Sequence, residues 1–226
     1  MTRVLDVRRL GRTDYRECWE LQRELVTARA DGTIEDALLL TEHDAIVTVG
    51  RGTPPENYPA VEHPVVEVER GGEATYHGPG QLVAYPILAL EAGRRDLHRY
   101  LRDLEEVVIG VLGEFGLVGE RAPGRTGVWI DGKKICSIGI AVRRWVTYHG
   151  LALNLHNPPE SHDGFRPCGL DASVMTRLAD HCELPPTNLL GEVLLVKHFC
   201  RVFDRELPPP GSSEPDARGF PSLPLL

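Results

Sequence analysis

The sequence has no apolar run long enough to cross a membrane and no recognisable secretory signal. A spanning helix needs roughly 20 consecutive apolar residues, and no stretch of the chain approaches that length. The N-terminal segment MTRVLDVRRLGRTD has neither the apolar centre nor the small-residue cleavage site of a signal peptide. These absences argue against a membrane protein and against a secreted one.

Cysteine is scarce, and its placement excludes a disulfide framework. The cysteines are odd in number, and their spacing is not that of a paired metal site. They are the five residues Cys18, Cys136, Cys168, Cys182 and Cys200. A reduced, cytoplasmic compartment therefore fits best.

Positive charge is also in short supply. The formal net charge is −8, whereas nucleic-acid-binding proteins normally carry a basic surface. What is present is ordinary: 42% of the 226 residues are hydrophobic and 26% are charged, as in an average globular domain. We expect a soluble globular protein with no nucleic-acid or membrane partner.

Only the C-terminal end departs from this composition. Between Pro208 and Leu226, six prolines and two glycines interrupt any regular period, which excludes a helix or a central strand. We therefore expect one domain over residues 1–207 and a proline-rich extension over 208–226.

Three segments have the apolar period of a buried helix face. They cover residues 14–30, 97–115 and 188–203, and Asp96 and Gly116 are placed to begin and end the second. The residues expected to be buried are Cys18, Trp19, Leu21 and Leu25 in the first helix, Leu97, Leu101, Leu104, Val108, Val111 and Phe115 in the second, and Leu190, Val193, Val196, Phe199 and Phe203 in the third. Cys18 and Cys200 lie on these faces, so we expect both to be inert thiols.

The segments between these helices predict strands. Branched and aromatic residues are frequent in residues 45–50, 65–69, 81–90, 127–131, 134–142 and 145–155. Asp131-Gly132 predicts a tight hairpin, and we expect a second turn at Arg143-Arg144. Strands cluster in the middle of the chain, and no Gly-x-Gly-x-x-Gly or Walker motif is present. The fold class is therefore α/β, with an α+β mixed sheet flanked by helices, and a Rossmann fold is excluded.

The glycine-rich segment RGGEATYHGPGQ, residues 70–81, is the first candidate site. Its glycines let the backbone approach a ligand closely, and Arg70 and His77 add a fixed cation and a titratable ring. A structural turn is the alternative. The conjunction of arginine, threonine, histidine and glutamine in one loop favours a site.

Two adjacent lysines begin the segment KKICSIGIAV, residues 133–142. Neighbouring residues of a strand point to opposite faces, so Lys134 shares a face with Cys136 and Ile138, and Lys133 lies on the other. A lysine removed from water gives up its proton more readily and can act as a base or an acid. We expect Lys134 to enter such a site and Lys133 to stay solvated.

Cys168 lies on irregular backbone outside any apolar period, and of the five thiols it is the only one we propose as a nucleophile. It lies between Pro167 and Gly169 in RPCGLD, and a helix starting near Asp171 would favour its thiolate. Cys168 is therefore the candidate nucleophile, and a purely structural thiol is the alternative.

The segments RGGEATYHGPGQLVAYPIL, GVWIDGKKICSIGIAVRRWVTYHGLALNL and RPCGL, in this order, resemble the lipoyl(octanoyl) transferase family. The resemblance covers about residues 70–178 and implies the fold of biotin- and lipoate-protein ligases. It implies a cytoplasmic acyltransferase that moves an octanoyl group from acyl carrier protein to a lysine of a lipoyl domain, the first step of endogenous lipoate biosynthesis. The implied acceptors are the lipoyl domains of 2-oxoacid dehydrogenase complexes and the glycine cleavage H protein. No metal or other cofactor is implied, and the small size suggests a monomer.

The resemblance also assigns residues. It implies Cys168 as the acyl-accepting cysteine and Lys134 as its catalytic partner. The implied substrate-binding residues are Arg70, Gly71, Gly72, Thr75, Tyr76, His77, Gly78, Gly80, Gln81, Ser137, Ile138, Gly139, His149, Gly150, Ala152 and Asn154.

Two positions depart from the family pattern. Cys136 stands where the family usually has alanine, and we expect it to be a harmless small side chain. The run Val174-Met175-Thr176-Arg177-Leu178 replaces the usual Val-Thr-Ser-Leu/Met, so no role is assigned around Thr176.

Three other functions stay open at this point. An ATP-using lipoate- or biotin-protein ligase has the same fold, but it needs no cysteine nucleophile, and the Gly-Arg-Gly-Arg segment of biotin ligases is missing here. A non-catalytic acyl-carrier-binding module would use Cys168 only structurally. A cysteine hydrolase would use His77 or His149 as its base.

Arginines are gathered in two places that could attract an acidic carrier protein. Arg94, Arg95, Arg99 and Arg102 lie at the start of the second helix, where the last three are spaced to share one face, and Arg143-Arg144 lie at the strand turn. A docking patch and an ordinary solvated surface are both compatible with this pattern.

Overall fold

The computed structural model describes residues 3–54, 62–162, 166, 171–184 and 186–209. Its helices are α1 (Tyr15–Ala30), α2 (Leu97–Glu114) and α3 (Asn188–Phe203). Its strands are β1 (Arg3–Thr13), β2 (Asp36–His43), β3 (Ile46–Val49), β4 (Val65–Glu67), β5 (Thr75–His77), β6 (Gln81–Ile87), β7 (Val128–Ile130), β8 (Lys133–Arg143), β9 (Val146–Asn154) and β10 (Arg205–Glu206). Short 3₁₀ turns cover Ala92–Arg94, Pro159–His162, Ala172–Val174 and Leu178–Asp180.

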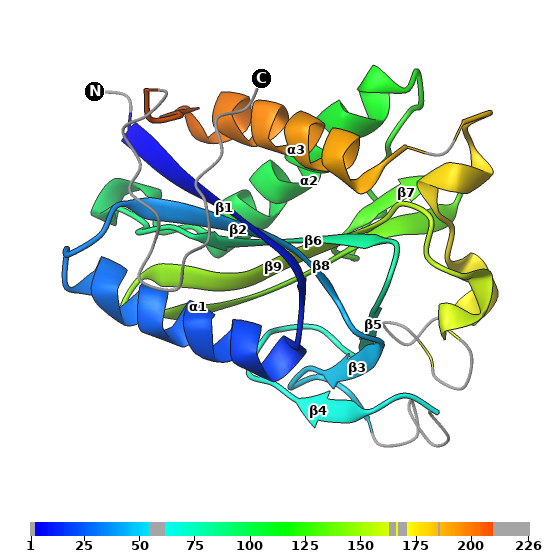
Figure 1. The fold of residues 1–226 in the computed structure, drawn as a ribbon, viewed down its shortest axis with the longest axis horizontal. Coiled ribbons are helices and arrows are strands. Elements are labelled where there is room, and N and C mark those ends of the chain that lie inside the picture. The colour runs from blue at the N-terminus through cyan, green and yellow to red at the C-terminus, as the bar shows by residue number, and fades with distance from the viewer. Residues whose placement is uncertain (1–2, 55–61, 163–165, 167–170, 185, 210–226) are drawn as a thin grey trace.

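A large mixed sheet forms the centre of the molecule. Its strand order is β10-β1-β2-β6-β9-β8-β7; β1 runs parallel to β10 and β2, and the pairs from β2 to β7 are antiparallel. Helix α1 covers one face, and α2 and α3 cover the other (Figure 1). The predicted α/β class with a mixed, helix-flanked sheet is confirmed.

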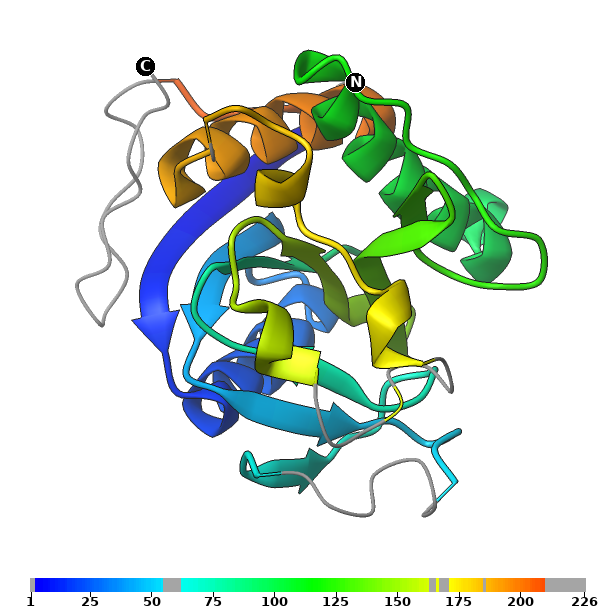
Figure 2. The same ribbon diagram turned by 90° about the vertical axis from the view of Figure 1, so that its right-hand side faces the viewer.

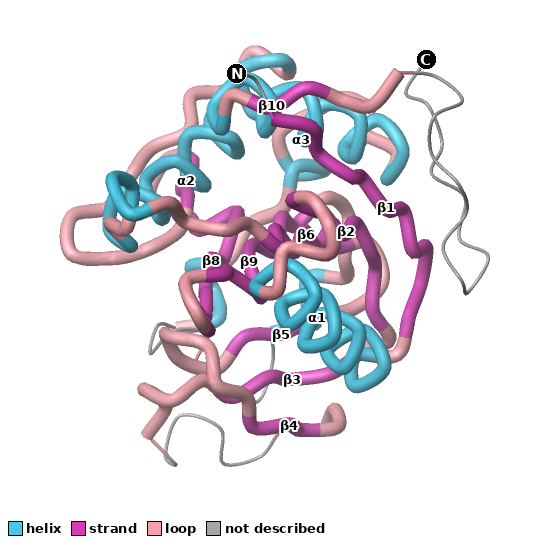
Figure 3. Tube along the Cα trace, turned by 90° about the vertical axis from the view of Figure 1, so that its left-hand side faces the viewer, coloured by secondary structure: helices cyan, strands magenta, loops and turns pink. Residues whose placement is uncertain are grey.

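A second, small sheet of order β4-β3-β5 lies on the α1 side of the large sheet (Figure 3). The antiparallel pairing of β3 with β5 makes Thr75–His77 of the glycine-rich segment part of this small sheet. Gln81, the last residue of the segment, begins β6 of the large sheet, so the segment connects the two sheets.

The large sheet is buried on both faces. In β2, Leu38 and Leu40 join the core under α2 and α3, whereas Ala37 and Leu39 join the core under α1. A strand covered on both sides has no polar alternation, which is why the run DALLLTEH was not predicted as a strand. β1 was missed for the opposite reason, because charged residues interrupt its apolar positions.

Each helix begins at a side chain that caps its free N–H groups. Asp14 accepts hydrogen bonds from the backbone of Arg16 and Glu17, Asp96 accepts one from Arg99 N, and Thr187 accepts one from Leu190 N. Gly116 has φ +72° after the end of α2. The predicted roles of Asp96 and Gly116 are confirmed.

The predicted buried faces need correction at their ends. Leu97 and Leu190 are exposed, at 38% and 43%, because each lies in the first turn of its helix. Trp19, Leu101, Phe115 and Val193 are only half-buried. Tyr15 and Leu195 are buried instead.

Both predicted hairpins exist, but the second is displaced by one residue. Asp131 and Gly132 have φ +48° and +77°, as a two-residue hairpin turn requires. The second turn is Arg144-Trp145, with φ +52° and +63°, and Arg143 still pairs with Val146. The expected turn at Arg143-Arg144 was therefore wrong by one position.

Within the described residues, no helix has both the length and the apolar character that crossing a membrane requires. The predicted extension lies almost entirely outside the described residues, so the division at residue 207 stays a prediction.

Candidate active site

The glycine-rich segment is held to both sheets by two neighbouring residues. The guanidinium Nη2 of Arg70 donates to the carbonyl and the hydroxyl of Thr48 on β3, at 2.9 and 2.8 Å. The backbone N–H of Gly71 donates to Ile140 O on β8 at 2.9 Å. Together these contacts position the loop between β3 and β8.

Glycines let the loop and the sheet come together. Gly139 and Gly150 are register partners on β8 and β9. A Cβ atom at Gly139 would lie 2.9 Å from Gly71 O, and one at Gly150 would lie 2.1 Å from Ala84 O. Larger residues at these positions would therefore force the backbone apart.

A small cavity, here the α1-side cavity, lies between α1, the glycine-rich segment and the sheet. Its volume of about 20 Å³ is enough for a water molecule. It is lined by Tyr15, Arg70, Thr75, His77, Tyr85, Ser137, Gly139, His149, Gly150, Leu151 and Ala152. It brings together eight of the predicted substrate-binding residues.

Two buried histidines, His77 and His149, line this cavity as neutral rings, and a third, His43, packs against His77. Burial lowers the pKa of His43 to about 4 and that of His149 to about 3. Burial, with smaller contributions from His43 and Arg70, also lowers the pKa of His77. Their rings are uncharged at neutral pH, so the cavity wall can accept an apolar group.

The backbone of His149 is fixed by a hydrogen bond, whereas its ring nitrogens have no hydrogen-bond partner among the described residues. It has φ +54°, and its N–H donates to Gln22 Oε1 of α1 at 2.8 Å. Among the described residues neither ring nitrogen has a hydrogen-bond partner, although the ring stacks on Tyr148 at 4.9 Å. A buried polar atom without a partner is costly, so a polar atom of a bound molecule would stabilise this ring.

A chain of hydrogen bonds connects the glycine-rich segment to Lys134. The Gln81 amide donates to Tyr76 O and Asn154 Oδ1, so its oxygen accepts from His77 Nδ1 at 2.9 Å. Asn154 Nδ2 donates to Thr176 O at 3.0 Å. Thr176 N donates to Lys134 O at 2.9 Å. The chain links two of the candidate segments, residues 70–81 and 133–142, through Asn154 and Thr176.

Lys134 is buried and Lys133 is not, as predicted. Lys134 is 2% exposed, and its Nζ lies 5.3 Å from the centre of the Trp129 ring. Its backbone forms a parallel bridge with Met175. Figure 2 shows the segment after residue 170, in yellow, running beside the green strands of the large sheet.

The buried carboxylate of Glu105 fixes the position of Gly127, which packs against the side chain of Lys134. Glu105, on α2, is fully buried and accepts hydrogen bonds from Arg102, Arg121 and the backbone N–H of Gly127. Gly127 has φ +136°, and a Cβ there would lie 2.8 Å from Lys134 Cε. Glu105 thus fixes the backbone against which the lysine stem packs.

A larger cavity, here the α2-side cavity, lies on the other face of β8. Its volume is about 430 Å³. It is lined by Gly71, Gly72, Glu73, Leu101, Gly124, Arg125, Thr126, Trp129, Lys134, Ile138, Gly139 and Ile140. Gly139 belongs to both cavities, so they meet at one strand.

The candidate nucleophile Cys168 lies outside the described residues, as does the start of the segment that follows it. Cys136 is fully buried, and burial raises the pKa of its thiol to about 12. Burial likewise raises the pKa of Cys18 to about 12. Cys182 and Cys200 are partly buried, and burial raises both thiol pKa values. None of these four thiols ionises readily at neutral pH.

Sequence reasoning missed several residues of the two cavities. Tyr15, His43 and Tyr85 pack their rings around His77 and His149, yet they come from separate helices and strands with no shared motif. Arg125 and Thr126 directly precede the quoted GVWIDG segment and could have been included with it. Gly78 and Gly80 line neither cavity, although Gly80 N donates to Glu42 Oε2.

Within the described residues, no group of three or more histidine, cysteine, aspartate or glutamate side chains is placed to hold a metal ion.

The chain is similar to known proteins over most of its length. The model of the lipoyl protein ligase A/B catalytic domain matches residues 14–199. An octanoyltransferase of Geobacter metallireducens is 44% identical over 211 residues, covering 92% of this chain and 98% of that protein. An octanoyltransferase of Rubrobacter xylanophilus is 50% identical over 203 residues, covering 84% and 91%.

Solved structures show the same fold at much lower identity. A putative lipoate protein ligase from T. acidophilum with bound lipoic acid superposes with a TM-score of 0.69 at 15% identity, covering 92% of this chain and 88% of that one. The biotin protein ligase from Aquifex aeolicus gives 0.52 at 12% identity, covering 90% and 69%. The ligase-type fold implied by the sequence is thereby confirmed. With the family match and the identity to octanoyltransferases, the chain belongs to the lipoyl(octanoyl) transferase family and is an acyltransferase.

Proposed function

We propose that the chain transfers an octanoyl group from octanoyl-acyl carrier protein to a lysine of a lipoyl domain, through a thioester on Cys168. The observation that carries this proposal is the backbone bridge between buried Lys134 and Met175 with Thr176. Cys168 stands seven residues before Met175 in the sequence, so the bridge anchors the segment that follows the thiol beside the lysine. We place the reaction in the cytoplasm, with lipoyl domains of 2-oxoacid dehydrogenases and the glycine cleavage H protein as acceptors.

In the first step, the thiolate of Cys168 attacks the carbonyl carbon of the donor thioester. A new carbon–sulfur bond forms, the bond to the carrier thiol breaks, and the leaving sulfur takes up a proton. Because one thioester replaces another, the step is nearly isoenergetic. Lys134 can hold the proton given up by Cys168 and pass it to the leaving thiol.

In the second step, the acceptor amine attacks the enzyme thioester. An amide bond forms, Cys168 leaves as its thiol, and the amine loses a proton. The amine must be neutral to attack, although a free lysine with a pKa of about 10.4 is protonated at neutral pH. Lys134, shielded from water, accepts that proton and returns it to the departing sulfur.

We assign the acyl chain to the α1-side cavity. Its histidine rings are neutral, and Tyr85, Leu151 and Ala152 add apolar surface, which suits an alkyl group. The volume of about 20 Å³ is far smaller than an eight-carbon chain, so the side chains of Tyr15, His77 or His149 must move when it enters. Binding is therefore an induced fit.

Intact-mass measurement after mixing with octanoyl-carrier protein tests the proposal. The wild-type chain should gain one octanoyl group without ATP, and Cys168→Ala should gain none. Cys168→Ser shows whether an oxygen can replace the sulfur. An adduct mapped to Cys136 would contradict the assignment.

The same experiment separates the other functions. An ATP-using ligase would form no adduct from the thioester and would need the free acid with ATP. A cysteine hydrolase would release free octanoate, and a carrier-binding module would show no chemistry. No observation in the structure favours these functions over the transferase.

A further inference from the structure

The α2-side cavity has no role in the chemistry described above, although its wall contains Lys134. Its volume of about 430 Å³ is within the range of small-molecule sites, roughly 300–1,000 Å³. Its rim includes Gly72, Gly124 and Arg125, all exposed, and its inner end is the 2% exposed Lys134. The cavity therefore leads from the surface to the proposed proton carrier.

Its lining suits a slender molecule that carries amides. Glu73, Thr126 and the backbone of Gly71, Gly72 and Gly124 supply polar atoms, while Leu101, Ile138 and Ile140 supply apolar walls. A pure alkyl chain would make favourable contact only with the apolar walls. A chain of alternating methylene and amide groups would match both kinds of surface.

The rim also carries a positive charge. Arg125 is exposed and its backbone N–H donates to Ala122 O, which leaves its guanidinium group at the surface. It lies on the same loop as Gly124 and Thr126, which also line the cavity, and it is exposed whereas Lys134 is buried. An arginine at this place would bind a phosphate group at the outer end of the arm.

We infer that the α2-side cavity receives the phosphorylated, amide-containing thiol arm through which the acyl donor presents its thioester. The inference rests on the proposed function, since it assumes a carrier-bound thioester. In this arrangement the arm enters past Arg125, its thioester reaches Lys134, and the acyl chain passes Gly139 to the α1-side cavity. The two cavities meet at that glycine, which lines both.

The test measures acyl-enzyme formation with donors that differ only in the arm: octanoyl-carrier protein, octanoyl-phosphopantetheine, octanoyl-pantetheine and octanoyl-N-acetylcysteamine. Arg125→Ala should raise the concentration for half-maximal acylation about tenfold for the two phosphorylated donors. The same variant should leave octanoyl-pantetheine and the short thioester unchanged. Arg125→Lys should recover most of the loss.

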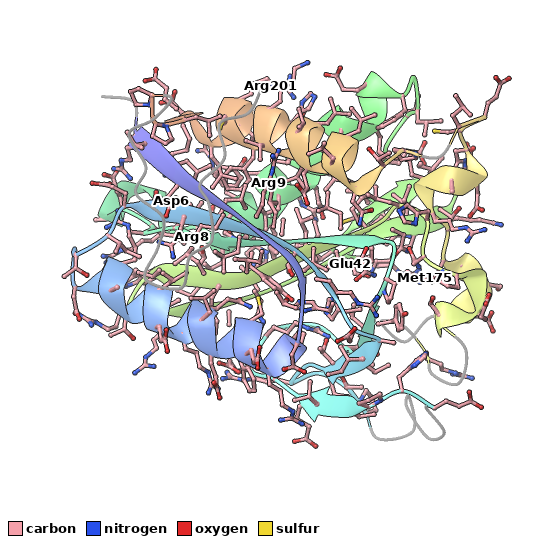
Figure 4. The ribbon with its side chains drawn as sticks, viewed as in Figure 1. Asp6, Arg8, Arg9, Glu42, Met175 and Arg201 are labelled. Atoms are coloured by element: carbon pink, nitrogen blue, oxygen red, sulfur yellow. The ribbon has the colours of Figure 1, made fainter. Side chains whose placement is uncertain are left out.

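A second variant, Ile140→Trp, narrows the cavity. It should slow acylation by all three long-armed donors at least about tenfold and by the short thioester much less. The charge control is Arg201→Ala, because Arg201 lies on α3, away from β8 (Figure 4). This variant should acylate at the wild-type rate with all four donors. Melting temperatures of all variants show whether they are folded.

Transfer from the isolated acyl-enzyme to a lipoyl domain separates the competing occupants. This step should keep its wild-type rate in both variants. If it slows while acylation is normal, the cavity admits the acceptor lysine, and if Ile140→Trp shifts preference toward shorter acyl chains on the short thioester, the cavity holds the acyl chain. Either result, or equal rates with all donors, overturns the inference while leaving the transferase function intact. Failure of the wild-type chain to form any acyl-enzyme would instead overturn the proposed function itself.

Discussion

At the scale of single residues, Cys136 shows how burial keeps a thiol close to the site protonated and therefore unreactive. It is fully buried on β8, and its raised pKa of about 12 keeps it protonated. We expect Cys136→Ala to acylate normally and to lose about 1 kcal/mol of unfolding free energy, because a small buried group is removed. Acyl-enzyme mass and chemical denaturation measure the two effects. Loss of acylation in a folded Cys136→Ala protein would contradict an inert thiol.

The neighbouring lysines provide a matched pair. Lys134 is 2% exposed, whereas Lys133 is exposed to solvent. We expect Lys134→Ala to lower the rate of octanoyl transfer at least about 100-fold and Lys133→Ala to leave it near the wild-type value. Both rates are measured with saturating carrier protein. Equal losses would show that the proton carrier has been assigned to the wrong residue.

His149 makes stability depend on pH. Its folded pKa of about 3 is below the ordinary value of about 6.5, so the unfolded chain binds the proton first. The contribution of the neutral ring to the free energy of unfolding is fully present above the unfolded pKa of about 6.5 and is lost as the pH falls toward the folded pKa. Between pH 6.5 and pH 5 one such ring contributes a loss of about 2 kcal/mol.

His149→Asn tests this expectation, because asparagine tolerates φ +54° and does not titrate. The wild-type protein should lose about 2 kcal/mol more unfolding free energy than the variant between pH 7 and pH 5. Urea denaturation at each pH measures the difference. Parallel curves would mean that the ring already gains a proton in the folded state.

At the scale of elements, the Glu105–Gly127 contact links α2 to the stem of Lys134. A methyl group at Gly127 would lie 2.5 Å from Cys136 O and 2.8 Å from Lys134 Cε. We expect Gly127→Ala to lower kcat about 10- to 100-fold, because the amine is displaced. The control is Gly113→Ala on α2, where nothing lies within 4 Å and helix propensity should add about 0.5–1 kcal/mol of stability. Unchanged kcat in Gly127→Ala would show that the stem tolerates the shift.

The elements also show what sequence patterns can and cannot predict. The three helices and the strands from β6 to β9 follow from period, caps and turn residues, because those signals are local. β2 was missed because both of its faces are buried, and β1 because its apolar positions are irregular. Leu97 and Leu190 were wrongly predicted to be buried, because a helical period does not show where a helix extends beyond the sheet that it covers.

The site divides in the same way. The glycine-rich segment, Lys134 and the His149-Gly150 strand carry dense local motifs, so the sequence predicted them as candidate site residues. His43 and Tyr15 are joined to them only through three-dimensional packing, with ring centres 5.1 Å apart. Glu105 lies on a helix face where a carboxylate ordinarily indicates solvent.

At the scale of the whole molecule, a chain of net charge −8 would repel an acidic carrier protein, the donor that we propose, unless basic side chains are gathered locally. The expected arginine face is only partly present. Arg95 precedes α2 and lies over Trp145, Arg102 is bound to buried Glu105, and Arg144 pairs with Asp31. Arg99 is 71% exposed, with Asp103 at 4.0 Å.

We therefore expect charge reversal of Arg95 and Arg99 together to raise KM for octanoyl-carrier protein about three- to tenfold at low salt. KM for a small uncharged thioester should not change, and added salt should reduce the difference. Arg16→Glu on the opposite helix α1 is the control. If KM is indifferent to both salt and charge reversal, the carrier docks elsewhere.

Because Met175 is bridged to Lys134, the number of residues between Cys168 and Met175 limits how far the Cys168 sulfur can lie from the Lys134 amine. Seven residues lead from Cys168 to Met175, and Met175 is fixed to the peptide of Lys134 by backbone pairing. An insertion between positions 169 and 174 would lengthen the chain between the sulfur and the bridge, whereas one between 157 and 158 would not. We therefore expect insertions before the cysteine to be tolerated and insertions after it to lower activity.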